Sequence, residues 1–167
     1  MSDPKAGILD FDAFVASLPS MAPLLGLDLG TKTIGVAVSD RTRMIATALE
    51  TVRRRKFTQD AERLSALIAE HGACGLVIGL PFNLDGSEGP RVQATGAFAR
   101  NLRRTIALPI LLADERWSTV AAERTLLEAD LSRRRRAEVI DQVAAVIILQ
   151  GALDRMRAGR READGAP

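Results

Sequence analysis

The chain has 167 residues, 47% of them hydrophobic and 26% charged, with a formal net charge of +2, which suits one folded domain and excludes a disordered chain. Cys74 is the only cysteine, so a scaffold built on internal disulfides is excluded as well. Because no apolar run approaches the ~20 residues of a membrane-spanning helix and the N-terminus lacks the pattern of a signal peptide, we expect a cytoplasmic protein with no membrane partner.

The two ends of the chain differ from the middle. Residues 1–22 form an extension in which apolar residues recur at helical spacing, which predicts a short amphipathic helix ended by Pro19 and Pro23. The apolar residues of this helix are Ile8, Phe11, Phe14, Val15 and Leu18. Residues 155–167 are rich in arginine and poor in apolar residues, which indicates a frayed, flexible tail.

Residues 23–154 form the expected domain. Short apolar runs predict strands at 24–29, 34–38, 44–52, 75–80 and 110–113. Apolar residues at helical spacing predict helices at about 58–71, 91–105, 118–129 and 135–154. Three sequential strands favour an antiparallel meander, and the later alternation of strand and helix favours parallel strands with helices on the sheet faces. The fold class is therefore mixed α/β.

The basic residues gather in two places. Of the 23 basic residues 20 are arginine, which GC-rich codons alone can explain. However, two runs, Arg53-Arg54-Arg55-Lys56 and Arg133-Arg134-Arg135-Arg136, form local patches in a nearly neutral chain. The planar guanidinium group can grip a phosphate with two hydrogen bonds. This pattern favours a polyanion held next to a cation-binding site.

Asp28 lies at the carboxyl end of the first domain strand, between Leu27 and Leu29. A carboxylate inside a core-forming run is costly unless it is paired or binds a cation, and ligand sites in open α/β sheets lie at this end of the strands. The alternative is an aspartate that caps the following turn.

Asp114 and Glu115 directly follow the strand at 110–113. Neighbouring strand residues point to opposite faces, so only one of the two needs to share a site with Asp28. Ser118 or Thr119 can cap the next helix and leaves the acidic pair without that duty. The alternative is an ordinary polar strand end.

Asp141 lies in the last predicted helix, at the edge of an apolar stripe that includes Ala144 and Ile148. An aspartate in a helix interior is a poor helix former, so a metal or an arginine partner must offset its cost. The alternative is a surface aspartate in a salt bridge, with the Arg133–Arg136 run as the source of the arginine.

Three carboxylates from distant segments can therefore converge on one rim of the sheet. Oxygen ligands suit Mg²⁺ or Mn²⁺, and with basic patches alongside, the natural chemistry is metal-assisted phosphodiester hydrolysis. His71 is the only histidine, which disfavours a Ser-His-Asp triad or a histidine-based zinc site. The loop from Gly79 to Glu88 joins a strand to a helix and can either receive a phosphate or act as an ordinary connection.

Four motifs together resemble one family. They are LDLGTKTIGVA at 27–37, GLP at 79–81 followed by Asn83 and Asp85-Gly86-Ser87, DERWST at 114–119, and DQVAAVIIL at 141–149. In this order and spacing they are similar to the motifs of the YqgF/RuvX family of RNase H-like nucleases.

The resemblance implies an RNase H-like fold, with a five-stranded mixed sheet in the order 3-2-1-4-5 flanked by helices. It implies a metal-dependent nuclease that matures the 5′ end of pre-16S rRNA. The alternative within the family is a Holliday junction resolvase, and a nucleic-acid-binding protein with little catalysis is a further alternative. A phosphate loop of the actin-like ATPase type also begins with Asp-x-Gly-Thr, but those proteins need two such domains and this chain has one.

The resemblance also implies roles for individual residues. Asp28, Glu115 and Asp141 match the family's acidic positions, as catalytic residues and as ligands of Mg²⁺ or Mn²⁺, and Asp114 matches a less defined one. Resolvase relatives carry an acidic residue where this chain has Gly79-Leu80-Pro81, so Glu115 on the next strand is expected to replace it. The expected contacts to pre-rRNA or branched DNA come from Lys32, Arg116, Arg133, Arg134, Arg135 and Arg136. RNA trimming suits a monomer, and a four-way junction suits a homodimer.

Overall fold

The computed structural model describes residues 8–81, 88–115 and 133–165, and within residues 133–139 it describes the helix but not the side chains. The expected helix at 118–129, Arg116, and residues 82–87 of the loop at 79–88 lie outside the described residues. No described helix has the length and apolar content needed to cross a membrane.

The centre of the molecule is a mixed sheet whose strand order is β1-β6-β5-β2-β3-β4. The strands are β1 (Ile8–Leu9), β2 (Leu25–Leu29), β3 (Thr33–Ser39), β4 (Ala46–Arg53), β5 (Leu76–Leu80) and β6 (Ile110–Asp114). The antiparallel meander is β2-β3-β4, while β5 and β6 continue the sheet in parallel with β2. If the five domain strands β2 to β6 are numbered 1 to 5, their order in the sheet is the expected 3-2-1-4-5. The mixed α/β fold is therefore confirmed.

The sheet has one strand more than expected. Ile8, which the spacing places in the amphipathic helix, and its neighbour Leu9 instead pair in parallel with Ile110 and Leu111 of β6. Strand β1 thereby covers the edge of β6, whose backbone groups would otherwise be unpaired on that side. Helical spacing alone did not reveal this pairing, because the partner strand lies about a hundred residues away in the chain.

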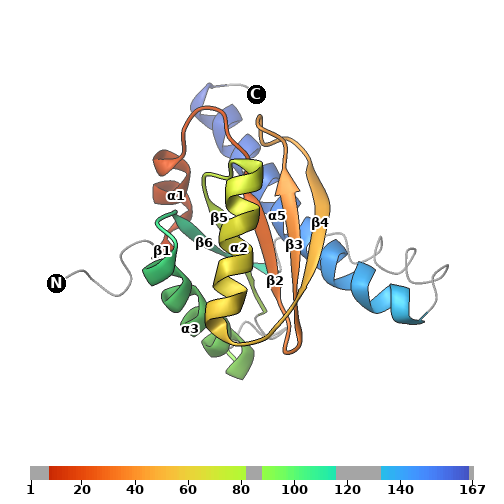
Figure 1. Cartoon of the computed structure of the whole chain (residues 1–167). Helices are drawn as coiled ribbons and strands as arrows, with labels where there is room; N and C mark the ends of the chain where they lie inside the picture. The colour runs from red at the N-terminus through yellow and green to blue at the C-terminus, as the bar shows by residue number, and fades with distance from the viewer. Residues whose placement is uncertain (1–7, 82–87, 116–132, 166–167) are drawn as a thin grey trace.

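Helices cover both faces of the sheet (Figure 1). Within the described residues they are α1 (Phe11–Ser17), α2 (Phe57–His71), α3 (Pro90–Thr105) and α5 (Arg133–Ala163). Helices α2 and α3 lie on one face and α5 lies on the other, where it packs on β2, β3 and β4. The side chains of a strand alternate between faces, so each strand supplies both layers.

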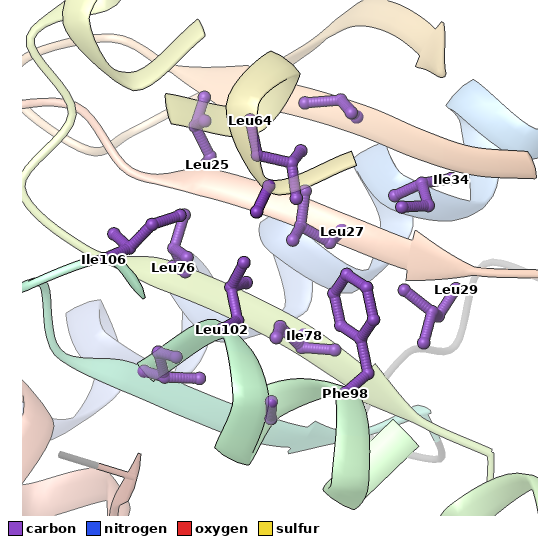
Figure 2. Packing of buried hydrophobic residues seen from close by; sticks show 14 of the residues in the cluster. Leu25, Leu27, Leu29, Ile34, Leu64, Leu76, Ile78, Phe98, Leu102 and Ile106 are labelled. Carbon is purple, nitrogen blue, oxygen red and sulfur yellow. The ribbon is translucent and has the colours of Figure 1, made fainter. Parts of the chain in front are cut away.

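The layer under α2 and α3 is the larger apolar cluster (Figure 2). Leu25, Leu27 and Leu29 of β2 all point into it. Ile78 of β5 and Phe98 of α3 are also part of this cluster. The odd-numbered positions of β2 are thus fixed on this face, which leaves its even-numbered positions, Asp28 among them, for the α5 face.

The layer under α5 depends on small residues. A Cβ atom at Gly26 would lie 2.6 Å from Leu149 Cβ, so only glycine permits this distance between helix and sheet. Helix α5 also runs nine residues beyond the expected end at 154, and Met156 is 3% exposed. Residues 155–163 are therefore helical rather than frayed, because Met156 continues the apolar stripe that arginine-rich composition concealed.

The extension packs on the same face as α5. The expected short helix is present as α1, with Asp10 as N-cap accepting a 2.8 Å hydrogen bond from Ala13 N. Phe14 is fully buried in the second apolar cluster, together with Leu24 and Leu153. The extension therefore contributes to the core of the molecule.

Candidate active site

Asp28 lies on the α5 face of the sheet, in the middle strand β2. It is half-buried and alternates with Leu27 and Leu29, whose side chains occupy the opposite core. Its register partner on β3 is Gly35. On the other side, Leu27 pairs with Ile78, so the parallel strand β5 brings Gly79 next to Asp28. The carboxylate therefore stands between two residues that have no side chain.

Asp141 occupies the space over Gly35. A Cβ atom at Gly35 would lie 1.9 Å from the carbonyl oxygen of Asp141, so the backbone of α5 rests directly on this glycine. The side chain is held as well, because Thr33 Oγ1 donates a 2.6 Å hydrogen bond to Asp141 Oδ2. Asp141 and Asp28 are therefore neighbours across the pair of strands β2 and β3.

Glu115 occupies the space over Gly79. Its Oε1 atom lies 3.1 Å from the position that a Cβ atom at Gly79 would take, beside Ile148 of α5. Alternation explains this placement, since Leu111 and Ala113 of β6 belong to the core under α5. Asp114 has the opposite parity and pairs with Leu80 at the end of the strand. Of the acidic pair, Glu115 is the member on the face of Asp28.

Asp28 thus lies between the other two acidic residues, with Asp141 on the side of β3 and Glu115 on the side of β5. Their oxygen atoms are the donors that hard divalent cations prefer, and the two glycines leave space around Asp28. As the described side chains stand, no group of three or more His, Cys, Asp or Glu residues is placed to hold one ion. The donor set fits Mg²⁺ or Mn²⁺, and ligation by all three carboxylates stays a prediction.

Of the predicted basic contacts, the structure describes the side chain of Lys32 and the backbone of Arg133–Arg136. Lys32 is exposed in the turn between β2 and β3, close to the carboxyl end of β2. Arg133–Arg136 form the first turn of α5, two turns before Asp141, and their side chains lie outside the described residues. Contacts of these residues with nucleic acid stay predictions, as does a contact by Arg116.

Sequence reasoning missed Thr33 and undervalued the two glycines. An isolated glycine inside an apolar strand indicates a close backbone approach, so Gly35 and Gly79 carried a usable signal. Thr33 carried none, because its partner Asp141 lies 108 positions away.

A search of solved structures identifies the fold. The chain resembles RuvC of Thermus thermophilus in complex with a Holliday junction substrate, with a TM-score of 0.52 and 14% identity over 81% of this chain and 96% of that one. At this identity the likeness shows the fold alone, which is the RNase H-like fold of RuvC.

Sequence comparison gives the family. The model of the RuvX family, described as Holliday junction resolvase, matches residues 22–155. A relative from Roseobacter denitrificans is 67% identical over 153 residues, which are 90% of this chain and 94% of that protein. A relative from a Ruegeria species is 66% identical over 147 residues, 88% of this chain and 94% of its own length. Both carry the name "Putative pre-16S rRNA nuclease". The chain belongs to the RuvX family.

Proposed function

We propose that the protein is a metal-dependent endonuclease that hydrolyses phosphodiester bonds in nucleic acid, and that it matures the 5′ end of pre-16S rRNA. One observation carries the proposal: Asp141, Asp28 and Glu115 come from three separate segments and lie on one face of the sheet, beside two glycines. The names of the two relatives support the choice of substrate. Such a substrate places the protein in the cytoplasm.

The carboxylates, Thr33 and the basic residues would have different roles in this reaction. Asp28, Glu115 and Asp141 would hold Mg²⁺ or Mn²⁺ through carboxylate oxygens. The bound ion would activate water and stabilise the negative charge that develops on the phosphate. Thr33 fixes one oxygen of Asp141, which restricts the carboxylate to one orientation. Lys32, Arg116 and the Arg133–Arg136 run would hold the phosphates on either side of the scissile bond.

Resolution of Holliday junctions is the second candidate. The description of the family model names this activity, and the RuvC structure contains a junction. A junction has two scissile strands related by two-fold symmetry, so this activity requires two active sites and favours a homodimer. Trimming of an RNA end needs one active site and favours a monomer.

The test is cleavage by the purified protein of a 5′-extended pre-16S RNA fragment and of a four-way DNA junction, each with Mg²⁺ or Mn²⁺. We expect RNA cleavage that Asp28→Asn, Glu115→Gln and Asp141→Asn each abolish. Glu62→Gln is the matched control, because Glu62 is exposed on α2 on the opposite face of the sheet.

Full activity in Asp28→Asn would overturn the assignment of the site. Cleavage of the junction but not of the RNA would transfer the proposal to the second candidate. Binding without cleavage in any metal would identify a nucleic-acid-binding protein.

A further inference from the structure

The basic run at the end of β4 lies beside the candidate active site. Arg53 pairs with Thr33 and Thr51 pairs with Gly35, and residues directly opposite each other on neighbouring strands point to the same face. Thr51 faces α5, because its Oγ1 accepts a 3.0 Å hydrogen bond from Gln142 Nε2. Arg53 stands two positions further along β4, next to the threonine that holds Asp141. It is therefore on the face of the three carboxylates.

Four exposed basic residues lie on the two backbone segments that meet at this end of the sheet. Arg53, Arg55 and Lys56 are exposed, and so is Lys32 in the adjacent turn. The two segments are joined by a 2.8 Å hydrogen bond from Arg54 N to Lys32 O. We call these four residues, Lys32, Arg53, Arg55 and Lys56, the β4 basic patch.

The protein does not neutralise this patch within its described part. Arg63 pairs with Glu50 and Arg157 pairs with Asp154, and no ion pair between described residues includes a patch residue. Glu50, the nearest acidic residue on β4, is therefore already occupied. Asp60 is 3% exposed and accepts its hydrogen bond from the backbone of Arg55, at 2.9 Å. Both neighbouring acids are thus held by other groups.

Arg54, in the middle of the run, has a different task. Its Nη1 donates a 2.6 Å hydrogen bond to Gly30 O, and its guanidinium lies 5.5 Å from the centre of the Phe98 ring. Arg54 and Asp60 therefore anchor the backbone of the run from both sides. The exposed side chains start from a fixed backbone, so less conformational entropy is lost when they bind.

We propose that the β4 basic patch is a binding track for the phosphodiester backbone, which leads a nucleic acid strand to the three carboxylates. Exposed arginines on a fixed backbone beside an acidic site suit a polyanion with repeating phosphates, because each guanidinium can grip one phosphate with two bonds. The phosphodiester is common to RNA and DNA. The inference rests on the proposed function for the reaction, but the track concerns binding only.

Binding in EDTA separates the track from the reaction. We would measure the affinity of the full chain for single-stranded RNA and DNA of one sequence by fluorescence anisotropy over a range of salt concentrations. Each phosphate contact on a single strand contributes about 0.7 to the slope of log K against log [salt]. The variant Arg53→Gln/Arg55→Gln/Lys56→Gln should therefore lower the slope by about 2 on at least one of the two polymers.

The matched control is Arg41→Gln/Arg104→Gln/Arg160→Gln, which removes the same charge from exposed positions at the opposite end of the sheet. It should change the slope much less. If both variants lower the slope equally on both polymers, or neither does, the track is wrong. Arg53→Gln alone, which should lower the slope by about 0.7, repeats the test if the triple variant melts early. If the wild-type protein binds nucleic acid as expected but does not cleave it, the proposed nuclease activity is wrong and the proposed binding track still holds.

Discussion

Glu115, which directly follows β6, lies over Gly79 of β5, with Oε1 3.1 Å from the position that a Cβ atom would take there. The glycine is thus the reason why a carboxylate from one strand can reach the neighbourhood of Asp28 on another. A Cβ at the same position would also lie 2.5 Å from Ile148 Cδ1, so the space over Gly79 is shared by an acidic and an apolar side chain.

Gly79→Ala should damage both stability and cleavage. Crowding a packed site costs about 1–3 kcal/mol, and a displacement of ~1 Å in a catalytic group can cost about 100-fold in rate. Ile148→Val removes the atom that lies nearest. The double variant should therefore recover stability in denaturant unfolding but not the cleavage rate, because Glu115 stays displaced. Recovery of both together would mean that Glu115 does not need this position.

Gly35→Ala should lower the stability of the protein more than Gly79→Ala does. Its Cβ would lie 1.9 Å from Asp141 O, and backbone atoms cannot move away as a side chain can. We expect a loss of at least about 1–3 kcal/mol and no cleavage. Gly151→Ala is the matched control in α5, because no atom beyond its chain neighbours and the nearby helix backbone lies within 4 Å of its Cβ position. A helical glycine-to-alanine change there should raise stability by about 0.5–1 kcal/mol. Equal losses of unfolding free energy in Gly35→Ala and Gly151→Ala, measured by denaturant unfolding, would contradict the close contact at Gly35.

Thr33 is a positioning residue for Asp141. Thr33→Val keeps the shape and removes the hydroxyl that donates to Asp141 Oδ2. Hydrogen bonds to charged groups are worth about 1.5–3 kcal/mol, so we expect kcat to fall by about 10–100-fold with KM nearly unchanged. Thr33→Ser retains the hydroxyl and should retain kcat. Equal activity in the valine and serine variants would show that the bond has no catalytic role.

Asp40, which lies far from the candidate site, should make the stability of the protein depend on pH. Its pKa is lowered from 3.8 to about 2, chiefly by the backbone hydrogen bond from Ile45, with further bonds from Thr42 and Met44. A lowered folded-state pKa stabilises the protein above the unfolded pKa near 3.8, and this contribution disappears as the pH falls to about 2. Asp40 is exposed, so the contribution is at most about 1 kcal/mol.

The variant that tests this is Asp40→Asn. In denaturant unfolding it should be less stable than the wild type above about pH 4, and the difference should close towards pH 2. A difference that is constant across this range would mean that the hydrogen bonds, and not the charge, carry the effect.

The local sequence pattern located the strands and helices well, because apolar residues recur with the period of the strand or helix that buries them. Apolar runs located all five domain strands, and the carboxylates at 28, 114 and 115 stood out because they interrupt or end such runs. The strand order 3-2-1-4-5 came from the family resemblance, since pairing between distant strands has no local signature.

Only the tertiary structure decided which residues meet. Alternation places Asp114 and Glu115 on opposite faces, but the packing of α5 determines which face carries Asp28. The bond from Thr33 to Asp141 and the pairing of Ile8 with Ile110 join positions about a hundred residues apart. Such contacts depend on register and on the distance between helix and sheet. Those quantities are set by the whole packed core, and a short stretch of sequence does not contain them.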